Sequence, residues 1–335
     1  MPKQLIGELR EGDSVDSTFV VRRKQLVAFR NKQGRYLSLV LADRSGQVDA
    51  RVWDDAEQIA DQFEQEDVIA VQGRVETFNQ KPQVIISSLQ RCDPEAFDEQ
   101  EFLPQCRRDP EALEEELLQI VDSVEQPYLR KLLAAFFEDP KFLAIFRRAP
   151  GAVSIHHAYL GGLMEHTVEV CSLCRLFCEH YPDLNRDLLL TGALLHDIGK
   201  LKELSFERTF EYTDEGRLLG HIAMGERIIT EQMDRIEGFP AQLKLMMRHL
   251  ILSHHGEYQY ESVRKAMTLE AITLHKAEDA DAQVNRFWQI KTKHREEGRT
   301  WTDYDRLLER FIYLGPTEEA GAEEEALTLF DDQER

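Results

Sequence analysis

The first 93 residues show the hydrophobic period of β-strands. Five runs rich in β-branched and aromatic residues nearly alternate between apolar and polar positions, and turn signals such as NKQG, DRSG and NQKP separate them. A short helical stretch, DDAEQIADQFEQE, lies between the third and the fourth run. The five strands predicted in this way cover residues 17–29, 34–43, 46–53, 67–78 and 81–92.

Five strands with a helix between the third and the fourth predict an OB-fold, a small Greek-key barrel. That fold commonly presents aromatic and basic side chains to single-stranded nucleic acid. For Trp53 and Phe78 the alternative is a place in the barrel core, because the sequence does not say which alternating face points inward. The candidates for a nucleic-acid face are Lys24, Arg30, Tyr36, Arg51, Trp53 and Phe78.

From residue 129 onward apolar residues recur at spacings of three and four, as in YLRKLLAAFFED and LKLMMRHLILSHHG, which predicts an all-α bundle. The chain is therefore predicted to be a multidomain α+β protein. The predicted parts are an OB-fold domain (1–93), an acidic helical connector (94–128), a helical domain (129–315) and a disordered acidic tail (316–335). Within the tail, LTLF offers a docking motif as the alternative to a solvated segment.

The net charge of −21 argues at first against a nucleic-acid partner. The charge is unevenly distributed, because residues 94–128 carry a net −9 and residues 316–335 a net −7. The remainder is close to neutral and has room for a local basic groove.

Two further features of the sequence indicate the cellular compartment. No apolar run approaches the 18 residues of a membrane span, and the N-terminus lacks the apolar core of a signal peptide. The five cysteines are odd in number and unevenly spaced, which disfavours a disulfide framework. We expect a cytoplasmic protein without a membrane partner.

The histidines gather in the helical part, where ten of the eleven lie between residues 156 and 275. Imidazole and carboxylate ligands suit Mn²⁺, Fe²⁺, Zn²⁺ or Mg²⁺, and separate helices of a bundle can hold them rigidly. A lone histidine is usually a core or surface residue, but an ordered series beside apolar helices predicts a metal site. The series comprises His166, His196, Asp197, His221, His254 and His255, followed by the carboxylates Glu278, Asp279 and Asp281.

The CSLC segment does not extend this site. Cys171, Cys174 and Cys178 have the spacing of one helix face, and no second CxxC completes a zinc cage. Free cysteine packs as a small apolar group, so these residues are predicted to be core.

The ordered motifs resemble the HD-domain superfamily of metal-dependent phosphohydrolases, and more closely the YhaM-type 3′–5′ exoribonucleases. The resemblance covers roughly residues 1 to 290, and one departure is Glu278, where the family pattern suggests an aspartate. The last ligand is therefore Glu278, Asp279 or Asp281. The motifs that carry the resemblance, behind the predicted barrel, are AYLGGLMEHTVEV, LLHDIGK, GHIAMG, ILSHHGE and LEAITLHKAEDADAQV.

The resemblance implies a manganese-stimulated exonuclease that acts on single-stranded RNA, with single-stranded DNA as a further substrate. One or two ions are expected, with Fe²⁺, Co²⁺ or Mg²⁺ as alternatives to Mn²⁺. Asp197, His221 and Lys200 are expected to act in hydrolysis, Lys200 by neutralising a phosphoryl oxygen. For Lys200 the alternative is a solvated side chain after a helix end.

Two other functions stay open at this point. One is a phosphohydrolase of nucleotides or cyclic dinucleotides that uses the barrel for regulation or dimerisation. The other is a non-catalytic single-strand-binding factor in replication or regulation, with a structural metal site. A homo-oligomer and a partner for the acidic tail are further expectations.

Overall fold

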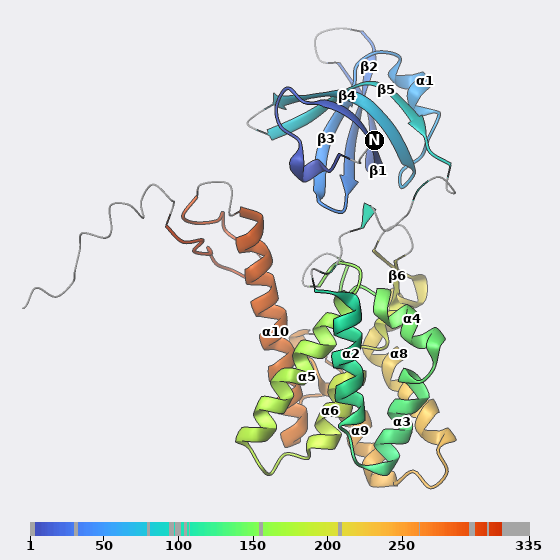
Figure 1. Cartoon of the computed structure of the whole chain (residues 1–335), viewed down its shortest axis with the longest axis vertical. Helices are drawn as coiled ribbons and strands as arrows, with labels where there is room; N and C mark the ends of the chain where they lie inside the picture. The colour runs from blue at the N-terminus through green and yellow to red at the C-terminus, as the bar shows by residue number, and fades with distance from the viewer. Residues whose placement is uncertain are drawn as a thin grey trace, which may run out of the picture.

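The computed structural model describes residues 4–29, 33–78, 81–93, 97, 102–103, 106, 108–153, 157–206, 210–260, 262–294, 299–306 and 308–316. A β-barrel lies at one end of the molecule and a helical bundle at the other (Figure 1). Candidate residue Arg30 and the acidic tail from residue 317 lie outside the described residues.

Five strands form the barrel after a short 3₁₀ helix, η1 (Ile6–Glu8). They close in the order β1-β2-β3-β5-β4, in which β3 and β5 run parallel and the other neighbours antiparallel. This arrangement confirms the predicted five-stranded OB-fold barrel. The strands are β1 (Ser14–Ala28), β2 (Arg35–Asp43), β3 (Gly46–Val52), β4 (Val68–Phe78) and β5 (Lys81–Arg91).

The helix between β3 and β4 is shorter than the predicted stretch over residues 54–66. Helix α1 covers Ala56–Ala60 and follows Asp55, which has a left-handed backbone with φ of 50°. Its apolar residues Ala56 and Ala60 join Phe63 in the barrel core. Alternate strand residues point to opposite faces, and the inward set fills the barrel. That set includes Phe19, Leu37, Leu39, Leu41, Ile69, Val71 and Val84, all of them buried.

The helical part begins with three helices that share one kind of start. Each has proline in its first turn, where the missing N–H costs nothing, after a polar residue whose side chain accepts backbone N–H bonds. The capping residues are Asp109, Gln126 and Asp139. The helices are α2 (Pro110–Asp122), α3 (Pro127–Phe137) and α4 (Pro140–Arg148). Helix α2, which was expected in a connector, buries Leu113, Leu117 and Ile120 in the core of the bundle.

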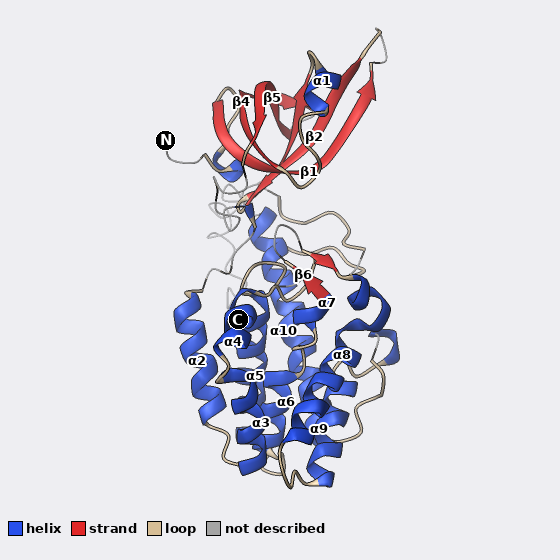
Figure 2. Ribbon diagram, turned by 90° about the vertical axis from the view of Figure 1, so that its right-hand side faces the viewer, coloured by secondary structure: helices blue, strands red, loops and turns tan. Residues whose placement is uncertain are grey.

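The remaining helices complete the bundle (Figure 2). A small antiparallel hairpin, β6 (Leu204–Ser205) and β7 (Glu211–Tyr212), interrupts them, and a 3₁₀ helix, η4 (Tyr258–Tyr260), precedes the last one. These helices are α5 (Gly162–His180), α6 (Arg186–Leu195), α7 (Lys200–Glu203), α8 (Asp214–Arg235), α9 (Ala241–Ser253) and α10 (Leu269–His294).

The cysteines behave as the sequence predicts. All five are free, and Cys171 and Cys174 are buried in the bundle core, with Cys178 packed against it. Burial raises the pKa of the Cys171 thiol well above its ordinary value, so the thiol stays protonated.

In the described parts of the chain, none of the helices combines the length and the apolar character that a membrane crossing needs.

Candidate metal centre and nucleic-acid surface

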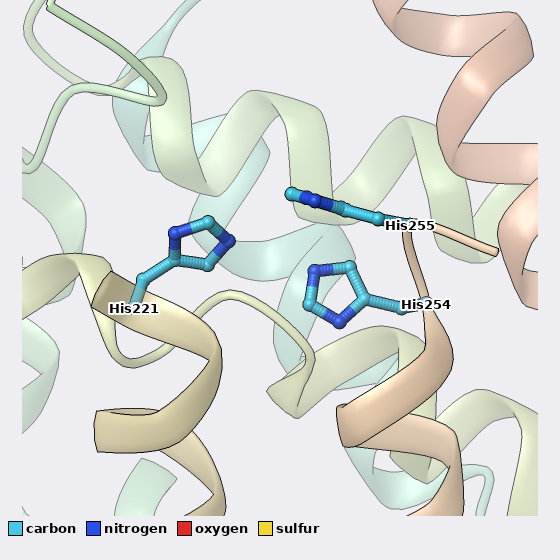
Figure 3. A group of neighbouring side chains, drawn as sticks. All are labelled: His221, His254 and His255. Carbon is cyan, nitrogen blue, oxygen red and sulfur yellow. The ribbon is translucent and has the colours of Figure 1, made fainter. Parts of the chain in front are cut away.

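Four helices bring the predicted histidines together. His166 lies in α5, His221 lies in α8, and His196 follows the last residue of α6. His254 and His255 follow the end of α9. Figure 3 shows the rings of His221, His254 and His255 turned toward one another. The series that is spread over 90 residues of sequence therefore forms one centre.

Two glycines permit this convergence. A Cβ on Gly199 would lie 2.0 Å from the carbonyl oxygen of His221, so only glycine lets the segment after α6 pack against α8. Gly220 interrupts α8 with φ of 72° and ψ of 154°, a backbone conformation that residues other than glycine rarely adopt. That kink immediately precedes His221.

Each of four histidines has its Nδ1 within reach of an acceptor. His196 donates to the carbonyl of Ala193 at 2.8 Å, and His254 donates to the carbonyl of Ile251 at 2.7 Å. Nδ1 of His166 lies 2.6 Å from Asp281, and Nδ1 of His221 lies 3.1 Å from Glu203. A neutral imidazole that donates through Nδ1 carries its lone pair on Nε2. With Nδ1 as the donor, Nε2 is the ring atom that can bind a cation in each of these four histidines.

The carboxylate of Asp197 lies between these Nε2 atoms. Its Oδ2 is 3.6 Å from Nε2 of His166 and 3.5 Å from Nε2 of His196. Its Oδ1 is 3.5 Å from Nε2 of His221 and 3.7 Å from Nε2 of His254. One carboxylate thus faces one pair of histidines with each oxygen.

The donor atoms fit divalent cations. Among the described residues, Oδ1 of Asp197, Nε2 of His221 and Nε2 of His254 are buried without a hydrogen-bond partner, which is costly unless a ligand satisfies them. Nε2 of His166 and of His196 lie 3.2 Å apart, a contact that needs either a proton on one of the two atoms or a cation bound by both. In the part of the chain that the structure describes, three sets of donor atoms lie within metal-binding reach: His166, His196 and Asp197; His221, His254 and His255; and His157, His166 and Asp281.

Electrostatic effects fix the protonation states of His196, His254 and Asp197. Burial lowers the pKa of His196 to about 4 and holds that of His254 well below its ordinary value, so both rings are neutral near pH 7. Burial alone would raise the pKa of Asp197, but Lys200 and the neighbouring histidines hold it well below its usual range. His196 and His254 are therefore neutral imidazoles beside an ionised carboxylate.

Lys200 belongs to the same centre. Its side chain is buried, and Nζ lies 2.6 Å from Oδ2 of Asp197. Burial would lower the pKa of Lys200, but the charge of Asp197 outweighs burial and raises it. The alternative of a solvated lysine is therefore wrong, and a fixed ammonium lies beside the donor atoms.

The three carboxylates of α10 lie in different places. Asp281 faces Nδ1 of His166, away from the Nε2 atoms, and Asp279 accepts from Gln283 on the same helix. Glu278 belongs to none of the close donor groups, but burial and then the negative charge of Asp197 raise the pKa of its carboxyl to about 8. Of the three, Glu278 is thus the one electrostatically coupled to Asp197.

Sequence reasoning missed two positioning residues. His157 is buried, and its Nε2 lies 2.8 Å from Oδ2 of Asp281, the oxygen that also faces His166. Glu203 accepts from both the backbone N–H (2.9 Å) and Nδ1 (3.1 Å) of His221. The sequence pointed to His157 only through the pair of histidines at residues 156–157. It gave no indication of a role for Glu203, which is a single glutamate at the end of LKE.

On the barrel, three rings lie close together, of which Trp53 is exposed and Phe29 and Tyr36 are half-buried. Trp53 lies 5.0 Å from Tyr36 and 6.0 Å from Phe29 between ring centroids, and the guanidinium of Arg51 lies 6.0 Å from the Tyr36 ring. Trp53 is 40% exposed and Phe78 62%, so the alternative that they belong to the barrel core is wrong. Phe29 was not a predicted candidate, although it ends the first predicted strand.

Lys24 differs from the other barrel candidates. Its ammonium donates to the carbonyl oxygen of Phe63 and lies 3.2 Å from the carboxylate of Glu64. The side chain is largely buried by these contacts.

Comparison with known proteins gives two family matches. A model described as the HD domain matches residues 163–283, and one described as an OB-fold nucleic acid binding domain matches residues 20–91. The 3′–5′ exoribonuclease YhaM of Oceanobacillus iheyensis is 33% identical over 251 residues, which make up 75% of this chain and 78% of that protein.

Two solved structures are similar to part of this chain. The second OB-fold domain of replication protein A from Methanococcus maripaludis is 19% identical, covers 29% of this chain and 99% of its own, and has a TM-score of 0.23. The replication factor A related protein from Methanobacterium thermoautotrophicum is 20% identical over 28% of this chain and 92% of its own, also with a TM-score of 0.23.

Proposed function

Because the chain belongs to the family of the YhaM 3′–5′ exoribonucleases, we propose that it shortens single-stranded RNA from the 3′ end by metal-dependent hydrolysis. The observation that carries this proposal is the carboxylate of Asp197, whose two oxygens face two separate pairs of histidines. A bridging carboxylate of this kind is what a two-metal phosphodiesterase centre requires.

We propose the following division of the donor atoms. His166, His196 and Asp197 hold one ion, with Glu278 as the further carboxylate of that site. His221, His254 and His255 hold the second ion together with the other oxygen of Asp197. Asp281 is assigned a positioning role behind His166, and not a place among the ligands, because it faces Nδ1.

Bound divalent ions supply an activated water and neutralise charge on the phosphoryl and leaving oxygens. Lys200 holds its ammonium beside Asp197, where it can pair with a nonbridging phosphoryl oxygen. His221 is fixed by Glu203 at the edge of the centre, which keeps its Nε2 directed at Asp197. We propose Mn²⁺ as the working ion, since the ligands are nitrogen and oxygen without thiolate.

In this proposal the barrel binds the single-stranded RNA. The exposed ring of Trp53 and the half-buried rings of Phe29 and Tyr36, with Arg51 beside Tyr36, fit base stacking and phosphate contact. Phe78, Lys24 and Arg30 are the further proposed contacts. A hydrolase of small nucleotides would have no use for such a surface.

Further parts of the proposal concern organisation. We propose domain limits near residues 93 and 315, with α2 of the predicted connector packed into the helical bundle, and we propose that the chain self-associates and that its acidic tail binds a partner. The free cysteines favour a reducing compartment, for which we propose the cytoplasm. Sedimentation of the full chain with and without residues 317–335 tests self-association and the effect of the tail on it.

The experiment that tests the activity uses a single-stranded RNA labelled at its 5′ end, incubated with Mn²⁺. The wild type should give a descending ladder of labelled products, and the His196→Ala, Asp197→Ala double variant should give none. His249→Ala is the matched control, because His249 lies in α9 but outside the close donor groups.

Other outcomes have definite meanings. Intact RNA with the wild type under Mn²⁺, Mg²⁺, Co²⁺ and Fe²⁺ contradicts the exoribonuclease proposal. Hydrolysis of nucleotides or cyclic dinucleotides in that case supports the small-substrate alternative. RNA binding without turnover of any of these substrates supports a binding factor.

A further inference from the structure

The second half of α10 leaves the bundle. Its buried residues, Glu270, Ala271, Leu274, His275 and Ala277, all lie in the first part of the helix, and none of its described side chains after Ala277 is buried. At 1.5 Å per residue the 26-residue helix is about 39 Å long. Figure 1 shows it extending beyond the neighbouring helices toward residues 299–316. The element that carries Glu278 and Asp281 therefore continues as an arm.

A hairpin follows at the end of this arm. Trp301 pairs with Tyr313 and Asp305 pairs with Arg310 as antiparallel bridges. Two oxygens of Asp305 accept from Nη2 of Arg286 in α10, at 3.0 and 2.9 Å. The hairpin is thereby attached to the helix that carries it.

The inner residues of the hairpin are apolar or satisfied. Thr302 and Ile312 are buried, the N–H of Thr302 donates to the carbonyl of Ile312, and the N–H of Ile312 donates to Oγ1 of Thr302. Trp301, Phe311 and Tyr313 flank these two residues, and since successive residues of a strand point to opposite sides, they point outward. The hairpin is therefore an ordered support for an outward face.

The exposed side chains of the hairpin include four aromatic rings in two pairs, and Tyr304 is placed among them by its exposure and its contact with Phe311. Trp301 and Tyr313 lie 5.0 Å apart between ring centroids, and Tyr304 and Phe311 lie 5.3 Å apart. Their exposed fractions are 53%, 51%, 51% and 59% in that order. Four large rings exposed on one short hairpin mark an interaction surface rather than scattered surface residues.

The charge of this segment indicates the kind of partner. Residues 284–316 hold seven Lys or Arg against five Asp or Glu, although the whole chain carries −21. Asp303 and Asp305 are paired with Arg299 and Arg286, respectively, while Arg310 is exposed on the hairpin. Aromatic rings beside arginines are the combination that binds single strands, through base stacking and phosphate contact.

We propose that the face formed by Trp301, Tyr304, Phe311 and Tyr313 is a second contact for single-stranded RNA, separate from the barrel. It stacks on bases of the strand whose 3′ end is at the metal centre. The inference rests on the proposed function, because it takes RNA as the substrate. Its basis is the attachment of the face to α10, the helix that also carries Glu278 and Asp281.

The test measures binding of a fluorescein-labelled 24-nucleotide single-stranded RNA by anisotropy in EDTA, so that no cleavage occurs. For Trp301→Ala, Tyr313→Ala we expect at least a tenfold higher Kd than for the wild type, while Mn²⁺-dependent turnover of bis(p-nitrophenyl) phosphate is unchanged. Trp301→Phe, Tyr313→Phe keeps the rings and should stay within threefold of wild type. Tyr181→Ala is the matched control, because Tyr181 is an exposed tyrosine stacked on Phe177 at the end of α5.

Three results overturn the proposal. The first is an RNA Kd within twofold of wild type for the double alanine variant, and the second is an equal loss for Tyr181→Ala. The third is an unchanged Kd with an altered mass in light scattering, which would make the face a contact between copies. If the double alanine variant does not fold, Tyr304→Ala, Phe311→Ala takes its place with the same expected results. A wild type that shortens RNA while the hairpin variants bind normally refutes only this inference, whereas a wild type that neither binds nor shortens RNA refutes the proposed function as well.

Discussion

Oδ2 of Asp281 lies 2.6 Å from Nδ1 of His166, on the side of the ring opposite to the Nε2 that faces Asp197. The same oxygen lies 2.8 Å from Nε2 of the buried His157. Burial would raise the pKa of Asp281, but its hydrogen bonds with the two histidines hold it well below the ordinary value. An ionised carboxylate behind a ligand fixes the ring and its tautomer.

Asp281→Asn should therefore weaken metal binding without removing a ligand. Loss of such a second partner typically costs about 10–100-fold in metal affinity, so activity should return at higher Mn²⁺ concentration. Titration of Mn²⁺ by calorimetry, together with activity at several Mn²⁺ concentrations, measures both effects.

Asp279→Asn provides the comparison on the same helix, because Asp279 accepts from Gln283 and lies in none of the donor groups found among the described residues. It should bind Mn²⁺ as the wild type does. Complete loss of activity in Asp281→Asn at saturating Mn²⁺ would mean that Asp281 is itself a ligand.

The number of bound ions is the second prediction. The wild type should hold two Mn²⁺ per chain by elemental analysis after desalting, and His221→Ala should hold one. Asp197→Ala should hold none, because each of its oxygens faces one of the two histidine pairs. His249→Ala should keep two. One ion per chain in both the wild type and His221→Ala would refute the second site.

Much of this architecture could be predicted because its signals are local. Strand period and turn residues predict the barrel strands to within about three residues, since alternation follows directly from side-chain direction. The metal series could be recognised because each histidine stands in a distinct motif, such as LLHDIGK or ILSHHGE.

What could not be predicted depends on contacts between distant residues. Glu203 and His157 act through partners 18 and 124 residues away, and nothing in their own segments reports those contacts. Whether Asp281 or Glu278 faces Nε2 of His166 depends on the rotation of α10 within the bundle. The exposure of Trp53 likewise depends on barrel closure, which brings it beside Tyr36.

The third prediction concerns the glycine of the HDIG segment. In Gly199→Ala the new Cβ would lie 2.0 Å from the carbonyl oxygen of His221 and 2.8 Å from the backbone N of Gly225, and no side-chain rotation relieves either clash. We expect a loss of about 1–3 kcal/mol in the free energy of unfolding. Metal affinity should fall as well, because the same segment carries Asp197.

Gly225→Ala is the matched variant from the other side of this contact. Its nearest neighbour atom would be 3.3 Å away, and alanine is preferred over glycine in a helix by about 1 kcal/mol, so stability should change little. Urea unfolding of both variants gives the comparison. Equal stability of Gly199→Ala and the wild type would show that α7 and α8 can separate at this point without cost.

The fourth prediction concerns the barrel. Trp53→Ala removes the ring that lies close to both Tyr36 and Phe29, and a lost base–ring stack costs about 1–3 kcal/mol, or roughly 5- to 150-fold in Kd. Binding of the 24-nucleotide RNA in EDTA should weaken by that factor, whereas turnover of bis(p-nitrophenyl) phosphate, which needs only the metal centre, should not change. Tyr181→Ala should alter neither quantity. If Trp53→Ala binds RNA as the wild type does, the strand does not stack on this part of the barrel, and its grip must come from other residues.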